Sequence, residues 1–191
     1  ANGANVGAYT VNRSTDNPGE FAFSYHVDCS TARSPSNNEM LELEQRIEGR
    51  NLQRFAKGTA SARQFALSFS VKTNVTGTYV VLLLDGQNSR MCMKTYTVSN
   101  TNWNRYNLIF PADTSGTWDF STSTRLSVKF VLMAGTDFTS GTAQTTWGSA
   151  VDANSRVGQT ANVGSSTSND WRITGVQLEA GPVVTPYEHK D

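Results

Sequence analysis

The chain has 191 residues, which is enough for one ordinary domain. Lys and Arg number 16, Asp and Glu also number 16, and the formal net charge is zero. A chain with no net charge gives no sign of the basic face of a nucleic-acid-binding protein or of the polybasic segment of a membrane-attached one. The apolar runs are far shorter than the roughly 18 residues that cross a bilayer, so membrane insertion is not expected either.

The first half of the chain begins with a polar stretch. Residues 1–19 are expected to form a polar arm or a truncated strand, followed by one domain over residues 20–181. Residues 21–27 alternate apolar and polar side chains and predict a strand. Residues 40–48 also alternate, with the acidic side chains all on one face, which favours a strand over a short helical stripe. Residues 51–55 are compatible with a single helical turn.

The next segments continue the period-two pattern of half-buried strands. Residues 64–72 alternate strictly, residues 78–84 form a continuous apolar and β-branched run, and the short break between them predicts a hairpin. Further strands are predicted at residues 90–98, 103–110 and 125–133. Short strands separated by polar turns, without long helical patterns, predict an all-β antiparallel sandwich of the jelly-roll type with polar loops and arms.

The last predicted strand, residues 171–178, changes parity in its middle. Trp171 and Ile173 share one face, Val176 and Leu178 the other, and Gly175 lies at the change. A β-bulge at Gly175 would return all four apolar side chains to one core. Before this strand, the polar segment 151–170 predicts a surface excursion or a contact arm. Residues 182–191 are expected to form a C-terminal tail.

The residues that commonly carry catalysis are scarce. Of the two histidines, His26 falls on the polar side of a predicted strand and His189 lies near the end of the chain. Glu42, Glu44 and Glu48 could pair as glycosidase carboxylates, but the solvated face of one strand explains them better. No nucleophile-elbow, zinc-protease or phosphate-loop motif is present. The sequence therefore predicts a protein that is not an enzyme.

Metal and redox chemistry receive little support as well. The loop residues Asp113, Asp119, Asp137 and Asp152 could offer oxygen atoms to calcium, but they lack the spacing of a calcium loop. We therefore expect no metal and no other cofactor. Cys29 and Cys92 could form one disulfide, although two partly buried thiols are the favoured interpretation.

The tryptophans offer one possible ligand contact. Trp103 and Trp171 begin strands whose pattern faces the core, so we expect both in the core. Trp118 and Trp147 lie among Gly, Ser and Thr residues, and they are the better candidates for exposed rings on which a sugar could stack. Large aromatic side chains that anchor loops onto a sandwich are an equally good explanation for these two.

The C-terminal stretch WRITGVQLEAGPVVTPYEHKD carries a specific motif. It resembles the closing motif of a group of bacteriophage virion proteins, tail-fibre and related structural modules, in which a GVQLE-G strand precedes a TP-F/Y-E segment. The matching residues are Gly175, Gln177, Leu178, Glu179, Gly181, Pro186 and Tyr187. Similar segments of the family match QRIEG at 45–49, the stretch at 65–81, the stretch at 102–118 and a remnant of the family's YtaDRW at 9–14, where Asn12 and Ser14 replace Asp and Trp.

The motif also has a physical interpretation that does not depend on the family. Gly175 permits the bulge and Leu178 closes the core. Gly181, followed by proline, ends the strand, because proline cannot donate to a sheet. Pro186 fixes the path of the exit and Tyr187 can lie against the edge of the sandwich. These roles are structural: they end the last strand and close the core, and they do not describe an active site.

The resemblance implies a jelly-roll module similar to carbohydrate-binding modules, displayed on the virion surface, often as a homotrimer, and without catalytic residues. The leading hypothesis is a tail-fibre, head-fibre or receptor-binding module that contacts host surface glycans. The alternatives are a capsid or tail decoration protein with a purely structural, oligomeric role, and a stand-alone carbohydrate-binding module. The expected partners are other virion proteins, further copies of the chain and host polysaccharide, on a particle assembled in the bacterial cytoplasm.

Overall fold

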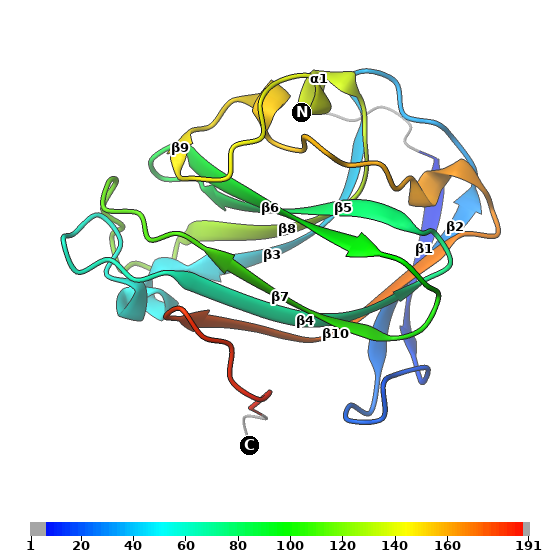
Figure 1. Ribbon diagram of the computed structural model, residues 1–191, viewed down its shortest axis with the longest axis horizontal. Coiled ribbons are helices and arrows are strands. Elements are labelled where there is room, and N and C mark those ends of the chain that lie inside the picture. Colours follow the sequence, from blue (N-terminus) through cyan, green and yellow to red (C-terminus); the bar gives the residue numbers. More distant parts are fainter. Residues whose placement is uncertain (1–6, 189–191) are drawn as a thin grey trace.

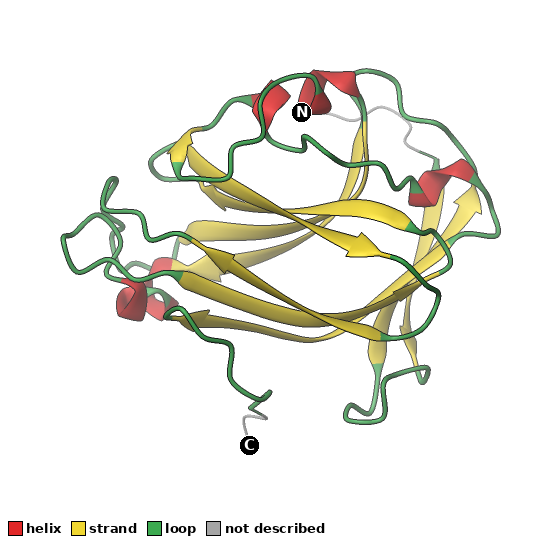
Figure 2. Ribbon diagram, in the orientation of Figure 1, coloured by secondary structure: helices red, strands yellow, loops and turns green. Residues whose placement is uncertain are grey.

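The computed structural model describes residues 7–188, which form two five-stranded antiparallel sheets packed face to face (Figures 1 and 2). The strands are β1 (Ala8–Ser14), β2 (Ser24–Thr31), β3 (Met40–Glu48), β4 (Phe65–Thr73), β5 (Gly77–Asp85), β6 (Arg90–Val98), β7 (Asn104–Phe110), β8 (Thr124–Ala134), β9 (Gly148–Ser149) and β10 (Asp170–Ala180). The short helices are η1 (Gly49–Asn51), η2 (Gln53–Phe55), α1 (Thr136–Thr139), η3 (Asp152–Asn154) and η4 (Val163–Ser165).

The order of the strands confirms the predicted jelly roll. Sheet A has the order β1-β2-β10-β4-β7, and sheet B has the order β3-β8-β5-β6-β9. From β2 to β5 the chain crosses from one sheet to the other at every connection, and it crosses again before β7, β8 and β10. This double wrapping of strand pairs is what separates a jelly roll from a simple meander.

The core lies between the inner faces of the two sheets. Phe69 of β4 stands at its centre, where edge-to-face contacts join its ring to Tyr96 at 5.1 Å and to Phe130 at 5.0 Å. Trp171 of β10 is fully buried, as predicted from the start of its strand. Trp103 differs from the prediction: it lies outside this core, and its indole N–H donates to Asp16 at 2.9 Å. Because large aromatic rings bury most area, this cluster supplies much of the hydrophobic stabilisation.

The strands predicted from alternation are present, with one shift. The element β3 has the predicted bounds, and each of the strands from β4 to β8 overlaps its predicted range closely. By contrast, β2 begins only at Ser24, so Phe21 and Phe23 fall in the loop before it. Phe21 instead packs against the ring of Tyr187 from the C-terminal tail, with centroids 4.8 Å apart. Phe21 therefore contributes to a tertiary contact rather than to a strand.

The predicted hairpin between residues 64–72 and 78–84 is wrong. The two strands are present as β4 and β5, but β4 pairs with β7 and β10 in sheet A, and β5 pairs with β6 and β8 in sheet B. The short connection between them is an arch that carries the chain across the core. At its start the Tyr79 hydroxyl donates to the Val75 carbonyl at 2.8 Å.

The segment between β8 and β10 is packed rather than a free arm. Ser155, Arg156, Ala161 and Val163 are all buried, although the sequence is polar. The segment covers the outer face of sheet B, as Figure 1 shows in yellow and orange above β5 and β6, and it closes a second apolar cluster there. Arg156 pairs with Glu42 at 2.6 Å beneath it, so Glu42 is not on a solvated face as expected.

Both cysteines are buried free thiols, as the favoured interpretation had it. Within residues 7–188 no helix is long and apolar enough to span a bilayer. The polar N-terminal segment contributes the edge strand β1, which pairs along its whole length with β2. His189 and the rest of the last three residues lie outside the described part of the chain.

Candidate functional site

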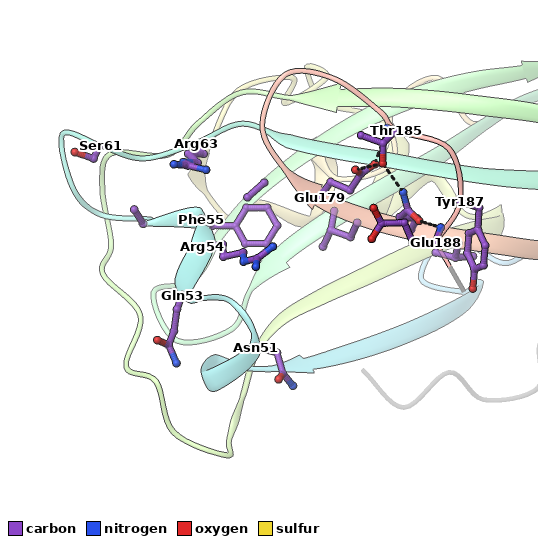
Figure 3. A pocket seen from close by; sticks show the side chains of 15 residues that line it. Asn51, Gln53, Arg54, Phe55, Ser61, Arg63, Glu179, Thr185, Tyr187 and Glu188 are labelled. Carbon is purple, nitrogen blue, oxygen red and sulfur yellow. Dashed lines mark hydrogen bonds between the residues drawn. The ribbon is translucent and has the colours of Figure 1, made fainter. Parts of the chain in front are cut away.

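An open groove of about 1410 Å³ lies at one end of sheet A (Figure 3). One wall is the segment from η1 through η2 to Arg63, and the other is the end of β10 with the C-terminal tail. The side chains along it are mostly amides, carboxylates, hydroxyls and guanidinium groups. Ligand sites are usually concave, and polar groups in them fix the orientation of the ligand. The predominantly polar lining of this groove suits a ligand that is itself rich in hydrogen-bonding groups.

The tail wall is built by the motif around Gly175. A register shift between Thr174 and Gln177 confirms the predicted bulge, and Gly175 has a φ of +60°. A side chain at this position would meet the ring of Phe21, whose nearest atom is 2.4 Å from an ideal Cβ. Glycine is therefore required twice, for its backbone conformation and for the close approach of Phe21.

The bulge returns only part of the apolar pattern to the core. Leu178 packs against the core, as expected, whereas Val176 is exposed and lines the groove. The reason is that the bulge places Val176 outside the regular ladder, which resumes with Gln177 opposite Ser68. Gln177 and Glu179 then point outward from sheet A.

These two outward side chains hold the tail in place. The Glu179 carboxylate accepts from the Thr185 hydroxyl at 2.6 Å and from its backbone N–H at 3.1 Å. The Gln177 amide accepts from the backbone N–H of Glu188 at 2.8 Å and donates to the Pro186 carbonyl at 3.3 Å. The motif residues therefore fold the chain back on β10 and form one wall of the groove.

The ionisation of Glu179 bears on its chemistry. Burial raises its pKa, but hydrogen bonds from Gln177 and Thr185 outweigh that effect, and the pKa ends below the usual value of a glutamate. A glycosidase needs a general acid that stays protonated, which requires a raised pKa. Glu179 is accordingly suited to accepting hydrogen bonds and unsuited to protonating a leaving group.

The other wall is held from below by aromatic stacking. Phe55, the last residue of η2, is buried and stacks on Phe65 with centroids 4.2 Å apart and an interplanar angle of 12°. Its neighbours Gln53 and Arg54 are exposed on the groove side. Ala56 follows in the left-handed conformation, with a φ of 46°, and turns the chain toward Lys57.

Lys57 anchors this wall through a buried cation site. Its side chain is 0% exposed, and its ammonium group lies 2.6 Å from Asp85 and 3.1 Å from Asp113. It also donates to the carbonyls of Ser115 at 2.9 Å and Gly116 at 2.6 Å. The ammonium thereby ties together three loops that gather at the left of Figure 1.

Trp118 and Trp147 belong to this anchor. Their rings lie 5.1 Å and 5.6 Å from the Lys57 nitrogen, a cation–π arrangement. Trp118 is 3% exposed, so the exposure expected for it is wrong; Trp147 is half-buried and donates to the Pro111 carbonyl at 2.8 Å. Neither residue lines the groove, and their role as a glycan contact stays a prediction.

Two of the four acidic loop residues considered as calcium ligands, Asp113 and Asp119, form ion pairs instead. Asp113 is buried against Lys57 and receives a two-bond contact from Arg90, at 2.8 Å for each bond. Asp119 pairs with Arg125 at 2.6 Å. Among residues 7–188 no group of three or more His, Cys, Asp or Glu side chains could hold a metal ion.

The sequence reasoning missed the wall formed by residues 51–63. A helical turn was expected at residues 51–55, and η1 and η2 are found there, but no binding role was assigned to Arg54 or Arg63. A signal was present in the high density of polar side chains around one buried aromatic residue, Phe55. Only the fold shows that this turn faces the C-terminal motif.

Comparisons with known proteins identify no family. No family model matches the chain, and no curated protein matches it. Among solved structures it is similar to the family 11 carbohydrate-binding module of a cellulosomal cellulase of Clostridium thermocellum, with 10% identity, a TM-score of 0.47, and 91% of this chain and 82% of that one covered. A family 4 carbohydrate-binding module shows 7% identity, a TM-score of 0.44, and coverages of 92% and 80%. Similarity of this degree defines neither a family nor a ligand for this chain.

Proposed function

We propose that this chain is a non-catalytic glycan-binding module displayed on a bacteriophage particle, in a tail fibre, head fibre or receptor-binding protein. The observation that carries the proposal is the open polar groove between the η1–η2 segment and the C-terminal tail. Its amides and carboxylates can accept and donate many hydrogen bonds at once, which is what the hydroxyl groups of a sugar chain require.

The glycan is expected to lie in the groove between residues 51–54 on one wall and the tail on the other. Asn51 and Gln53 present exposed amides on one side, and Tyr187 offers an aromatic ring on the other (Figure 3). An amphipathic ring of this kind combines an apolar face with a polar tip. The lowered pKa of Glu179 supports binding rather than hydrolysis.

The virion assignment rests on the resemblance of the C-terminal segment to phage structural modules. The residues of that resemblance, Gln177, Glu179 and Pro186 among them, are the ones that hold the tail wall. A stand-alone carbohydrate-binding module outside a phage would use the same groove in the same way. Incorporation into purified particles, detected with an antibody against this chain, is expected for the virion assignment, and its absence from particles contradicts it.

The binding proposal is tested with immobilised bacterial surface polysaccharides. The wild-type chain is expected to bind at least one of them, and the double variant Asn51→Ala/Gln53→Ala should bind several-fold more weakly. The matched control is Gln45→Ala/Asn107→Ala, which removes two exposed amides outside the groove. Absence of binding to the whole panel, or equal binding by both double variants, would overturn the groove as the site.

The same panel examines the tryptophans. A Trp147→Phe variant keeps an aromatic ring next to Phe65, whose centroid lies 5.4 Å from that of Trp147. Unchanged binding by this variant shows that the indole N–H and the larger ring of Trp147 are not needed for the glycan contact. A loss of binding with an unchanged thermal midpoint would move the contact to the loop that carries Trp147.

A second candidate function is a purely structural role as a decoration or fibre protein, in contact with other virion proteins and with its own copies. The observation that favours it is a set of exposed apolar side chains on the β1–β2 hairpin: Val11 is 51% exposed, Phe23 42% and Tyr25 41%. Light scattering decides this point. A stable trimer that Tyr25→Ser dissociates supports the structural role, and a monomer at high concentration contradicts self-assembly through this hairpin.

A further inference from the structure

We infer that the ligand of the groove is an anionic polysaccharide, whose acidic groups are bound by Arg54 and Arg63. The inference rests on the proposed function and specifies its substrate class. Both arginines line the groove on the η2 wall, and both are exposed. Neither has a carboxylate or a side-chain hydrogen-bond partner within the described part of the chain.

This lack of partners sets the two residues apart from the other arginines of the protein. Every other arginine has a partner of its own. Arg105 donates to Ser68 and to the Gly175 carbonyl, and Arg13 lies over the ring of Phe23. The other seven form ion pairs with carboxylates: Arg33, Arg46, Arg50, Arg90, Arg125, Arg156 and Arg172. In a chain with equal numbers of acidic and basic residues, the two unpaired guanidinium groups therefore occur together in the one groove described above.

A solvated surface arginine needs no partner, so the exposure of Arg54 and Arg63 does not by itself indicate a ligand site. The hydrogen bonds of the opposite wall provide the second observation. Of the two acidic side chains on that wall, Glu179 accepts hydrogen bonds from the hydroxyl and the backbone N–H of Thr185. The tail thus uses its own hydrogen bonds to hold that carboxylate, and the guanidinium groups stay available to a ligand.

The two walls of the groove therefore carry opposite charges. The guanidinium groups of Arg54 and Arg63 lie on the η2 wall, and the exposed carboxylate of Glu188 lies on the tail wall (Figure 3). A guanidinium group presents a planar fork of donors that matches two oxygen atoms of a carboxylate or a sulfate. Sugar hydroxyls can donate to Glu188 on the tail wall. A chain of acidic and neutral sugar units satisfies both walls.

The η2 wall holds its arginines on a rigid base. Phe55 stacks on Phe65 directly beside Arg54, and Lys57 closes the turn two residues later through its buried ion pairs. The backbone N–H of Arg63 donates to the Phe55 carbonyl at 2.9 Å, which joins the two parts of the wall. The backbone positions of both arginines are thus fixed before a ligand arrives, which lowers the entropy cost of binding.

The experiment measures binding of the full chain to polygalacturonate, dextran sulfate and neutral dextran by calorimetry. We expect binding to an anionic polymer that weakens with added salt and falls at least about tenfold in Arg54→Gln/Arg63→Gln. Preference for polygalacturonate identifies carboxylate as the recognised group, and preference for dextran sulfate identifies sulfate. The control Arg13→Gln/Arg46→Gln removes the same charge outside the groove and should bind within about twofold of wild type.

Three results would count against the inference. Equal losses in both double variants would show a nonspecific charge effect. Binding of neutral dextran with no binding of either anionic polymer would overturn the anionic ligand and leave the glycan-binding function standing. Absence of binding to all three polymers and to the surface polysaccharide panel would overturn the glycan-binding function itself.

Discussion

Replacement of Lys57 by methionine should destabilise the protein strongly. The substitution keeps an unbranched chain of similar length but removes the ammonium group from among the carboxylates of Asp85 and Asp113 and two carbonyl oxygens, at 2.6 to 3.1 Å. Removing one partner of a buried ion pair costs about 3 to 5 kcal/mol, because the remaining charge stays buried. The loss is also expected to loosen the wall of the groove.

The remaining contacts of the two carboxylates place the expected cost within that range. Asp85 keeps the backbone N–H groups of Gln87 and Asn88 at 3.0 Å, and Asp113 keeps Arg90. These contacts moderate the loss, while the two carbonyls left without a donor add about 1 kcal/mol each. We therefore expect the free energy of unfolding to fall by about 4 kcal/mol.

Urea unfolding followed by tryptophan fluorescence measures this loss. The control is Lys72→Met, which breaks the partly exposed pair of Lys72 with Asp16 at 2.7 Å and should cost less than about 1 kcal/mol. The double variant Lys57→Met/Asp85→Asn should recover part of the stability, because it removes one unpaired buried charge. A loss below about 1 kcal/mol for Lys57→Met, or equal losses for the two single variants, would refute the reasoning.

Three further predictions concern other parts of the molecule. Gly175→Ala should lower the free energy of unfolding by about 1 to 3 kcal/mol, through the positive φ and the contact with Phe21, whereas Gly86→Ala, which has open space around it, should be nearly neutral in thermal unfolding. The protein should lose stability as the pH falls below about 4, because the folded state lowers the pKa values of four carboxyl groups, those of Asp16, Asp113, Asp119 and Glu179. The contribution of these groups to stability is complete above their pKa values in the unfolded chain and disappears as the pH falls through their pKa values in the folded protein. An acid titration in which stability stays constant from pH 6 to pH 2 would contradict this prediction. The Cys92 thiol should resist an aromatic disulfide reagent at pH 8 until urea unfolds the chain, because burial raises its pKa to about 12; rapid labelling of native protein at Cys92, located by peptide mapping, would be inconsistent with its position.

Local patterns were sufficient for most of the strands and for the bulge. Alternation identifies β3 and β4 because each has one face toward the core, and the parity change at Gly175 locates the bulge because a slip of one residue would expose Leu178. The connection between β4 and β5 could not be assigned in this way. A short polar break is compatible with a hairpin or with an arch, and the choice depends on the partners that β7 and β10 offer to β4.

The candidate site depends even more on distant residues. Lys57 and Asp85 are 28 positions apart, and no local spacing indicates that they meet. The small, polar neighbours of Trp118 and Trp147 favour exposure of both rings, yet Trp118 is buried, Trp147 is half-buried, and both rings lie beside the Lys57 ammonium. Arg54 and Arg63 indicate a ligand site only because no other side chain within residues 7–188 pairs with them, and this cannot be recognised without the folded structure.

The position of β10 governs the order in which this molecule can be made. The last strand of the chain lies in the interior of sheet A, between β2 and β4, and its registers with both are antiparallel. A growing polypeptide therefore leaves the ribosome with β2 and β4 unpaired on the sides that will face each other, and such open edges invite association with other chains. Sheet A becomes continuous only when residues 170–180 insert between β2 and β4, so this sheet closes after the other four of its strands have been synthesised, in a highly non-local step.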